Sequence, residues 1–490
     1  VTIDDSAFQN NTYIKSVVLP SSLRTIGDDA FYGCVNLESV TFNEGLESIG
    51  GSSFWLCISL KDVEFPQTLT ELGTYAFHSC ISLTDITIPS GVKDIYGTFS
   101  GCVGLTSVTM LGVRSSIYAF EGCKNLESLS LPSTMEEFMD MRLVSLKTVT
   151  VSENNENYKV VDGVLFSEDG KDLVLYPSAL DRKDYTIPEG VETICSCAFT
   201  YVNGLETVTF PSTVKEMEEQ AFYVCDLLRS VTFNEGFKNM EYAFYGCDSL
   251  VSVDIPSGVE SLTYAFVDCD ALESIDIPAS VTYLSDDFLD ECHSLRTITV
   301  SKDNANYKVI DGVLFSKNGK TLVKYPAMLE NTTYDVPSGV NRILDDAFEG
   351  VVFLKYVNFP DSLEYIGDNA FENACSLTTV VIPDGAYIGE EAFEDCHALK
   401  EVTLGKNVEV DDEAFKYCGN LERITIMDSS YELGMDALYW CESLKEVIVS
   451  DDNDLYKLVD GVLFSKDGNS LIRYLENDER TEYVVPEGTM

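Results

Sequence analysis

The chain repeats one pattern of apolar and polar positions along most of its length. A phenylalanine marks a fixed place in the pattern, with steps of 21 to 23 residues inside each of three series. The series are Phe8, Phe31, Phe54, Phe77, Phe99 and Phe120; Phe199, Phe222, Phe244, Phe266 and Phe288; and Phe348, Phe371, Phe393 and Phe415, with Leu438 in the next place. Such a period is typical of a solenoid, whose coils bury their apolar sides against one another. The pattern therefore favours one repeat array over several ordinary domains.

Each period predicts two short strands and a corner. In "LESVTF", Val40 and Phe42 alternate with Ser39 and Thr41, which is the pattern of a half-buried strand. In the same way we expect Val231 to point inward and Thr232 outward. A second apolar pair, such as Leu23 and Ile26, suits a second strand on the opposite wall. The "AF..C" segment then turns the corner, and the short period predicts 3₁₀ turns or single helical turns there.

Cysteine is part of the period. Eleven of the fifteen cysteines lie three residues after the marker phenylalanine or Leu438, and Cys292 and Cys375 lie four after it. Equivalent positions in stacked coils have parallel Cβ vectors, which do not suit disulfide geometry. We therefore interpret these cysteines as small buried side chains that fill a narrow corner, with disulfides or metal binding as alternatives. Cys195 and Cys197, in "CSC", depart from the pattern and complete no ligand set.

Three segments of a different kind interrupt the coils. They begin at Tyr158, Tyr307 and Tyr456, at intervals of 149 residues, and each contains two Asp-Gly or Asn-Gly turns between apolar runs. Such turns join antiparallel strands, so each segment predicts a three-stranded meander. The acidic or Asn-rich segments before them predict Asx-turn loops. Asp451, Asp452 and Asp454 would suit calcium, but the other two copies replace most of these carboxylates.

The alternation of coils and meanders divides the chain into six segments, which we expect to form one continuous solenoid. They are coils at 1–151, a meander at 152–186, coils at 187–300, a meander at 301–335, coils at 336–449, and at 450–490 a third meander with the start of a further coil.

The coils and meanders together resemble the bacterial BspA-like leucine-rich repeat family. Representative stretches are "TIPSGVKDIYGTFSGCVGLTSVTM" (Thr87 to Met110) and "DIPSGVESLTYAFVDCDALESIDIP" (Asp254 to Pro278), with the "Y...DGVLFS.DG..L..YP" segments. The resemblance covers essentially the whole chain. It implies a leucine-rich repeat solenoid of the α/β horseshoe type, mostly β with short 3₁₀ or helical corners. The solenoid would be right-handed, with a parallel concave sheet and three inserted β-meander modules. Family members are typically secreted or cell-surface bacterial proteins, and some resemble adhesins.

Charge narrows the possible partners. The formal net charge is −50, with 82 acidic and 32 basic residues. This field repels phosphate backbones and anionic lipids, so we expect no nucleic-acid partner. No apolar run is long enough to span a membrane, so we expect no membrane insertion of this segment. The chain opens and closes within the pattern. We expect a piece of a longer protein, secreted or on the cell surface, whose export signal is not in this segment.

The sequence offers little for catalysis. The three histidines, His78, His293 and His397, are more than a hundred residues apart, and a solenoid keeps distant coils apart. A zinc site or a Ser/His/Asp triad built from them is therefore disfavoured. No phosphate-binding glycine loop occurs, and the resemblance supplies no catalytic motif. We predict no enzyme activity, no cofactor and no metal.

Two sets of residues are candidates for binding. Threonines recur at outward strand positions, in the pairs Thr148 and Thr150, Thr207 and Thr209, and Thr297 and Thr299. Aromatic residues follow the marker phenylalanine at Tyr32, Trp55, Tyr223 and Tyr245, with His78 in the same place. The alternatives are plain β-propensity for the threonines and packing between coils for the aromatic residues.

These observations predict a non-enzymatic, monomeric adhesion scaffold that binds a protein or glycan on a host or bacterial surface. A glycan-binding module and a passive stalk that projects another domain are the rival functions.

Overall fold

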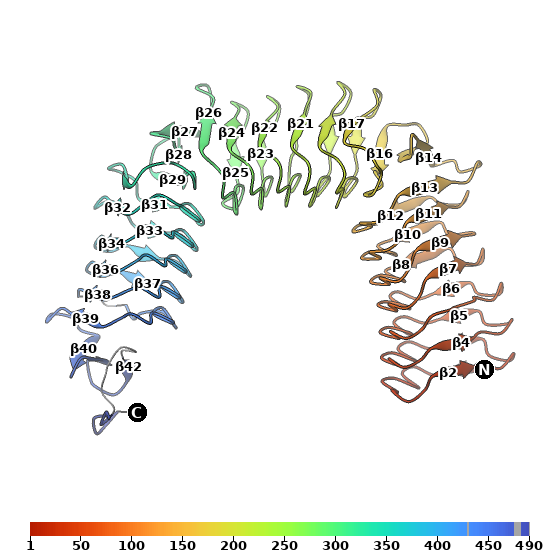
Figure 1. The fold of residues 1–490 in the computed structure, drawn as a ribbon, viewed down its shortest axis with the longest axis horizontal. Helices are drawn as coiled ribbons and strands as arrows, with labels where there is room; N and C mark the ends of the chain where they lie inside the picture. The colour runs from red at the N-terminus through yellow and green to blue at the C-terminus, as the bar shows by residue number, and fades with distance from the viewer. Residues whose placement is uncertain (429–430, 475–481, 490) are drawn as a thin grey trace. The chain divides into compact units, whose positions relative to one another are not determined.

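Short strands and tight turns make up the whole of the described structure. The computed structural model describes residues 1–428, 431–474 and 482–489, and its chain forms two compact units, Val1–Asp248 and Ser249–Met490. Within these residues there is no helix of any kind. Each unit is a β-solenoid, in which successive coils stack with their strands parallel (Figure 1). The end of the third meander segment, at residues 475–481 and 490, lies outside the described residues.

Most coils contribute a strand to a first wall, and the coil at Asp62 contributes an isolated bridge to Ser39. The first-wall strands of unit 1 are β2 (Ser16–Val18), β4 (Ser39–Thr41), β7 (Asp85–Ile88), β9 (Ser107–Met110), β11 (Ser128–Leu131), β13 (Thr148–Val151), β17 (Asp184–Thr186), β19 (Thr207–Thr209) and β21 (Ser230–Thr232). Those of unit 2 are β22 (Ser252–Asp254), β24 (Ser274–Ile277), β26 (Thr297–Val300), β30 (Thr333–Asp335), β32 (Tyr356–Asn358), β34 (Thr379–Ile382), β36 (Glu401–Leu404), β38 (Arg423–Ile426) and β39 (Glu446–Val449).

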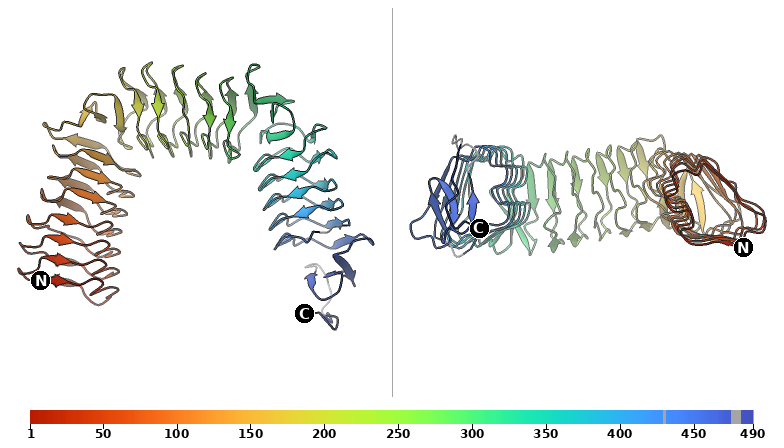
Figure 2. Two further views of the ribbon diagram at one scale, coloured as in Figure 1. Left: turned by 180° about the vertical axis from the view of Figure 1, so that it is seen from behind. Right: turned by 90° about the horizontal axis from the view of Figure 1, so that it is seen from below.

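A second wall of shorter strands faces the first. In unit 1 it contains β1 (Thr2–Ile3), β3 (Thr25–Ile26), β5 (Ser48–Ile49), β6 (Glu71–Leu72), β8 (Asp94–Tyr96), β10 (Ser115–Ile117), β12 (Glu137–Met139), β18 (Thr193–Ile194) and β20 (Glu216–Met217). In unit 2 it contains β23 (Ser261–Leu262), β25 (Tyr283–Leu284), β31 (Arg342–Ile343), β33 (Tyr365–Ile366), β35 (Tyr387–Ile388) and β37 (Glu409–Val410). Figure 2 shows the stacked walls of each unit from two further directions.

The register of the walls follows the sequence period. Val208 pairs with Val231 and Thr209 with Thr232, so residues one period apart become neighbours in parallel strands. Val231 is 6% exposed and Thr232 is exposed, which confirms the inward and outward assignment. The inward residues of successive coils therefore pack into apolar clusters, one with buried residues from Leu19 to Leu175 and another with buried residues from Val313 to Leu463.

The corners are not helical, and that prediction is wrong. Asp29 and Gly33 have φ angles of 53° and 69°, in the left-handed region. As a result, backbone N–H groups alternate in direction: Phe31 donates to Ser53 of the next coil at 2.7 Å, whereas Tyr32 donates to Asp29 of its own turn at 3.0 Å. A helix would direct every N–H along its own segment and leave the carbonyls of the next coil unpaired. The corners are therefore turns that hydrogen-bond to each other.

The marker phenylalanines stack inside the corners. Ring centroids of Phe8 and Phe31 are 4.9 Å apart, and those of Phe31 and Phe54 are 5.0 Å apart. Beside them, the thiol of Cys57 donates to the carbonyl oxygen of Phe31 at 3.2 Å. Ten other cysteines do the same one coil after another: Cys34, Cys80, Cys102, Cys123, Cys225, Cys247, Cys292, Cys396, Cys418 and Cys441. These thiols are buried and unpaired by disulfides, so the predicted corner packing is confirmed for them, with a hydrogen bond added.

Cys375 corrects the sequence interpretation, whereas Cys197 departs from the corner pattern, as predicted. Cys375 is exposed, because Ala374 takes the buried place in that corner. Cys197 is buried, 3.8 Å from the side-chain oxygen of Gln220, rather than against a phenylalanine carbonyl. Burial raises the pKa of the Cys102 and Cys292 thiols to about 12. They are therefore weak nucleophiles in the folded chain.

The meander segments join the second wall. In the first, β14 (Tyr158–Val161), β15 (Val164–Ser167) and β16 (Asp172–Leu175) pair antiparallel. The equivalents are β27 (Tyr307–Ile310), β28 (Val313–Ser316) and β29 (Thr321–Lys324), then β40 (Tyr456–Val459), β41 (Val462–Ser465) and β42 (Leu471–Arg473). In the first two meanders the third strand then pairs parallel with the next coil, β16 with β18 and β29 with β31. The right-handed path, the concave sheet and the six segment boundaries stay predictions.

Asparagine side chains fix the loops before the meanders. The side-chain oxygen of Asn155 accepts hydrogen bonds from the backbone of Asn157 and Tyr158 at 2.8 and 2.7 Å. Asn304 and Asn453 do the same in the other two copies. The predicted Asx turns are confirmed. In the third copy, Asp451, Asp452 and Asp454 are exposed around the buried Asn453, so the asparagine fixes the loop.

The irregular coil before the first meander lacks the usual corner, and a side chain there supplies the hydrogen-bond acceptor that the corner backbone supplies elsewhere. Phe120 donates its backbone N–H to Oδ1 of Asp140 at 2.9 Å, where other corners offer a backbone carbonyl. Asp140 is 4% exposed, and burial raises its pKa well above the usual range. One side chain thus continues the hydrogen-bond ladder across a shortened coil.

Candidate binding surfaces

The six predicted threonines lie on the outward face of the first wall. Thr207 is half-buried and the other five are exposed. The three pairs belong to three separate sheets, so the structure does not bring them together. Some of their hydroxyls are already engaged: Thr207 donates to Asp184 at 2.6 Å, and Thr299 donates to Asp276. These neighbouring carboxylates make the face a mixed polar surface rather than an uninterrupted hydroxyl array.

Tyr32, Trp55 and His78 form a stacked column along the corners of unit 1. The ring centroids of Tyr32 and Trp55 are 6.0 Å apart, and those of Trp55 and His78 are 4.3 Å apart with a 24° interplanar angle. All three side chains are half-buried. Burial lowers the pKa of His78, which keeps its ring neutral near pH 7. The column therefore packs between coils and also presents aromatic surface to solvent.

Three tyrosines that the sequence reasoning missed extend this column. Tyr75 lies 5.5 Å from Trp55, and Tyr96 lies 6.2 Å from both Tyr75 and Tyr118. They precede the marker phenylalanine by two or three residues, whereas the predicted aromatic residues all lie directly after it. Tyr96 is 44% exposed. We call Tyr32, Trp55, Tyr75, His78, Tyr96 and Tyr118 the aromatic edge.

A shallow groove adjoins the aromatic edge. It has a volume of about 430 Å³ and lies over the second-wall strands β6, β8 and β10. Its lining includes Tyr96 together with Lys93, Asp94, Glu71 and Ser115. The groove thus combines an aromatic ring with charged and hydroxyl groups within three neighbouring coils.

Two other groups of aromatic residues also lie close to the marker positions of successive coils. Tyr223 stacks on Tyr245 at 5.0 Å and 18°, and Tyr201 lies 5.9 Å from Tyr223. The predicted pair is therefore brought together, although its members are half-buried. In unit 2, Tyr417, Tyr439 and Trp440 are mutually 5.9 to 6.3 Å apart and are the more exposed, at 36%, 42% and 48%. Sequence reasoning missed this group because Tyr417 and Trp440 lie two residues after the marker position.

Ionisable residues gather in unit 2 where the second meander meets the coils. Among the described residues, one group places His and carboxylate ligand atoms within 4.8 Å of one another: Glu291, His293 and Glu349. Lys324, with 4% of its side chain exposed, lies 3.5 Å from Glu349. Burial lowers the pKa of Lys324, but the nearby Glu349, Asp290 and Asp346 outweigh it and the net shift is upward. Burial also raises the pKa of Asp346, to about 8.

In the described part of the chain, no helix is long and apolar enough to cross a membrane.

Comparisons with known proteins agree with this architecture, which is that of a leucine-rich repeat protein. The model of the BspA type leucine-rich repeat region matches residues 1–118, 99–168, 178–296, 240–335 and 325–445. The chain belongs to this family. No curated protein matches it.

Several solved structures are similar. A leucine-rich cell surface protein from Faecalibacterium prausnitzii is 32% identical, with a TM-score of 0.55, over 61% of this chain and 83% of that one. A leucine-rich repeat protein from Bacteroides ovatus is 22% identical with a TM-score of 0.42, over 79% and 83% of the two chains. One from Eubacterium ventriosum is 20% identical with a TM-score of 0.40, over 78% and 82%.

Proposed function

We propose that this chain is a non-enzymatic adhesion scaffold, displayed at a bacterial cell surface as a monomer, that binds a protein of a host or neighbouring cell through the aromatic edge of unit 1. Family membership and the similar cell surface protein of F. prausnitzii support the setting. Stacked coils supply a large surface, which suits attachment through many contacts.

The stacking of the aromatic edge carries the proposal. Trp55 rests on His78 at 4.3 Å and contacts Tyr75 at 5.5 Å, so its ring is held before any partner arrives. Tyrosine and tryptophan bury large areas and lose little conformational entropy, and they dominate binding energy at protein interfaces. A ring that is already held by its neighbours loses still less conformational entropy on binding. The net charge of −50 favours a partner with a basic surface.

Glycan recognition is the second candidate, and the groove supports it. Tyr96 offers an aromatic face, while Asp94, Lys93 and Ser115 offer hydrogen-bonding groups beside it. A passive stalk would need neither the groove nor the aromatic edge.

The test is a binding screen of the purified chain against extracellular-matrix proteins and glycans, repeated with Trp55→Ala. For a protein partner bound at this edge, we expect Trp55→Ala to lower the affinity at least about tenfold, or about 1.4 kcal/mol. Tyr356→Ala is the matched control, because Tyr356 is 48% exposed on the first wall of unit 2. An unchanged thermal melt would show that Trp55→Ala still folds.

Each other outcome has a definite meaning. Binding that Trp55→Ala leaves unchanged would contradict the aromatic edge as the site. Binding to glycans alone, lost on Tyr96→Ala, would favour the groove and the second candidate. Binding to neither class would favour the stalk.

A further inference from the structure

The second meander brings two distant corners together in unit 2. Glu291 and His293 lie in the corner after Phe288, and Glu349 follows Phe348, 56 residues after His293. The segment that follows β29 lies between these corners: Met328 donates to Leu295 at 2.8 Å, and Tyr325 donates to Ala347 at 2.7 Å. These backbone bonds hold the three side chains at one junction.

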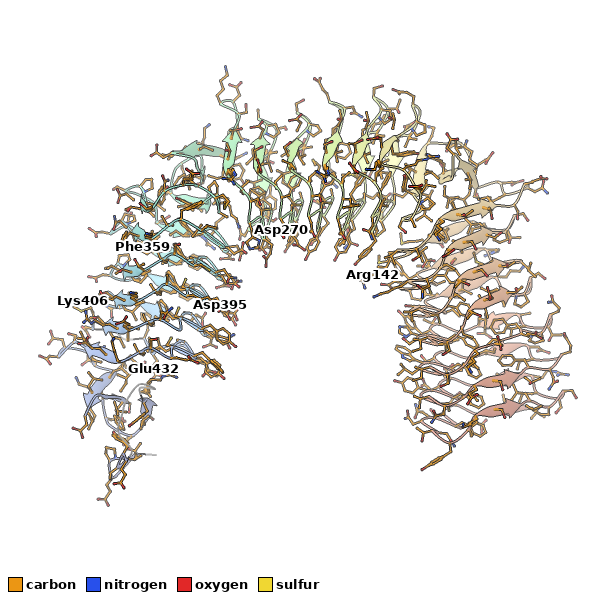
Figure 3. The ribbon with its side chains drawn as sticks, viewed as in Figure 1. Arg142, Asp270, Phe359, Asp395, Lys406 and Glu432 are labelled. Atoms are coloured by element: carbon orange, nitrogen blue, oxygen red, sulfur yellow. The ribbon has the colours of Figure 1, made fainter. Side chains whose placement is uncertain are left out.

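The hydrogen bond of His293 determines which ring nitrogen faces the carboxylates. Nδ1 of His293 lies 2.9 Å from Oδ1 of Asp270, which lies in the preceding corner (Figure 3). A carboxylate only accepts, so Nδ1 carries the proton. In the neutral ring Nε2 then has a lone pair, and it faces Glu291 at 3.2 Å and Glu349 at 3.8 Å. Three acceptors point at one another, which is unfavourable unless a cation or a second ring proton lies between them.

The spacing suits a small cation. Tetrahedral bonds of about 2.0 to 2.2 Å place ligand atoms about 3.4 Å apart, close to the two distances from Nε2. Imidazole together with carboxylates is a zinc-type donor set, whereas calcium takes six to eight oxygen ligands.

Hydrogen bonds from neighbouring groups orient His293 and Glu349, as second partners of metal ligands commonly do. Asp270 orients the ring of His293 as the outer partner of a ligating histidine does. The Nζ of Lys324 and the backbone N–H of Glu291 lie 3.5 and 3.2 Å from Oε2 of Glu349, which leaves Oε1 directed at His293. Glu349 is buried, whereas the side chains of His293 and Glu291 are 42% and 54% exposed. Solvent therefore reaches one side of the group, where an ion can enter and keep a water ligand.

We propose that Glu291, His293 and Glu349 form a binding site for a divalent transition-metal ion of the zinc class. The site lies in unit 2 and does not depend on the proposed partner surface. The rival state is a doubly protonated His293 that donates to Asp270 and Glu291 with no ion present.

The test measures binding of Zn²⁺ and Co²⁺ to the full chain, stripped with a chelator and dialysed. Millimolar Mg²⁺ is present to occupy weak sites on the acidic surface. We expect one tight equivalent of Zn²⁺ per chain, and cobalt absorption bands typical of nitrogen and oxygen ligands. His293→Ala and Glu291→Gln should each weaken binding at least about tenfold.

The control is His397→Ala, because His397 is a 61% exposed histidine with a single carboxylate, Asp395, within 3.8 Å. Its affinity should equal that of the unaltered chain. Equal binding by His293→Ala, or only weak binding that Mg²⁺ abolishes, would overturn the proposal in favour of the protonated histidine. Since Glu291 is exposed, Glu291→Gln tests the site even if another variant folds poorly.

Discussion

Two junctions between a meander and the following coils share one backbone and differ in chemistry. In unit 1, Tyr176 donates to Ala198 at 2.8 Å, and in unit 2, Tyr325, 149 residues later, donates to Ala347 at 2.7 Å. Ala179 donates to Leu146 at 2.9 Å in the first, and Met328 donates to Leu295 at 2.8 Å in the second. The same hydrogen bonds therefore build both junctions.

The side chains at equivalent positions differ in charge. The first junction has Val144, Leu175, Cys197 and Thr200, where the second has His293, Lys324, Asp346 and Glu349. Leu175 is part of the apolar interior of unit 1, whereas Lys324 donates to the carbonyl oxygen of Asp346 at 2.8 Å and pairs with Glu349. Because backbone bonds hold the stack, a corner can exchange apolar side chains for ionised ones while keeping its shape. This also explains why "CSC" is unusual: Cys197 occupies the place of an aspartate.

The largest expected effect is the loss of the buried cation. Lys324→Met leaves Glu349 and Asp346 without their ammonium partner, and breaking a buried pair typically costs about 3 to 5 kcal/mol. Hydrogen exchange in coils 336–400 should accelerate accordingly. The double variant Lys324→Leu, Glu349→Thr introduces the residues of the first junction at two of the four differing positions and should recover part of the loss. A single variant that costs under about 1 kcal/mol would show that the pair does not stabilise the junction.

The reverse change should disrupt the first junction. Leu175→Lys places an ammonium among apolar side chains with no carboxylate at the position of Thr200, and we expect a loss of about 3 kcal/mol. Adding Thr200→Glu should restore part of it, as Glu349 does for Lys324 in the second junction. Urea unfolding curves, together with hydrogen exchange of residues 170–205, measure the loss in the single variant and its recovery in the double variant. Equal stability of the single variant and the unaltered chain would contradict the comparison.

Stability near the second junction should fall as pH rises from about 5 to 8. Burial raises the pKa of Asp346 to about 8 and that of Glu394 to about 7. Unfolded carboxyls titrate near pH 4, so between these values the folded chain holds protons that the unfolded chain has released. We expect a loss of about 2 kcal/mol over this range, measured with a chelator present, because the buried groups titrate together. Asp346→Asn should make the stability depend less on pH. A stability that rises between pH 5 and pH 8 would contradict this prediction.

The smallest effect concerns an exposed ion pair at the first junction. Arg142 lies 3.8 Å from Glu121, and their side chains are 51% and 32% exposed. Arg142→Ala should cost less than about 1 kcal/mol, because solvent screens such pairs. Thermal melts at low and high salt measure it. A larger loss that persists at high salt would mean that Arg142 supports the corner through packing.

The walls of the fold could be predicted from the sequence because residues one period apart pair in neighbouring parallel strands. Each wall residue pairs with the residue one period away, so Val208 and Val231 share an environment and a side-chain type. The helical corners were a wrong prediction because "AF..C" fits either a helical turn or an alternating turn. Only the left-handed φ of residues such as Asp29 separates the two.

The candidate sites were predicted less completely. Tyr75 and Tyr96 were missed because they lie before the marker phenylalanine, whereas the predicted aromatic residues lie directly after it. The group around His293 escaped because only histidines were compared, whereas its other residues are carboxylates. One of them, Glu349, reaches His293 across a meander. Threonines such as Thr299 were found on the expected face, but their hydroxyls are shared with carboxylates on neighbouring strands.

Each junction is supported by coils in which alternate residues of a wall strand point into the apolar interior. The most direct measurement compares thermal unfolding of Val231→Asp and Thr232→Asp, adjacent residues of β21 with opposite burial. An unpaired carboxylate at Val231 is placed in the apolar interior and should unfold the neighbouring coils at a much lower temperature, whereas Thr232→Asp should melt like the unaltered chain. Equal melting of the two variants would contradict the assignment of the walls.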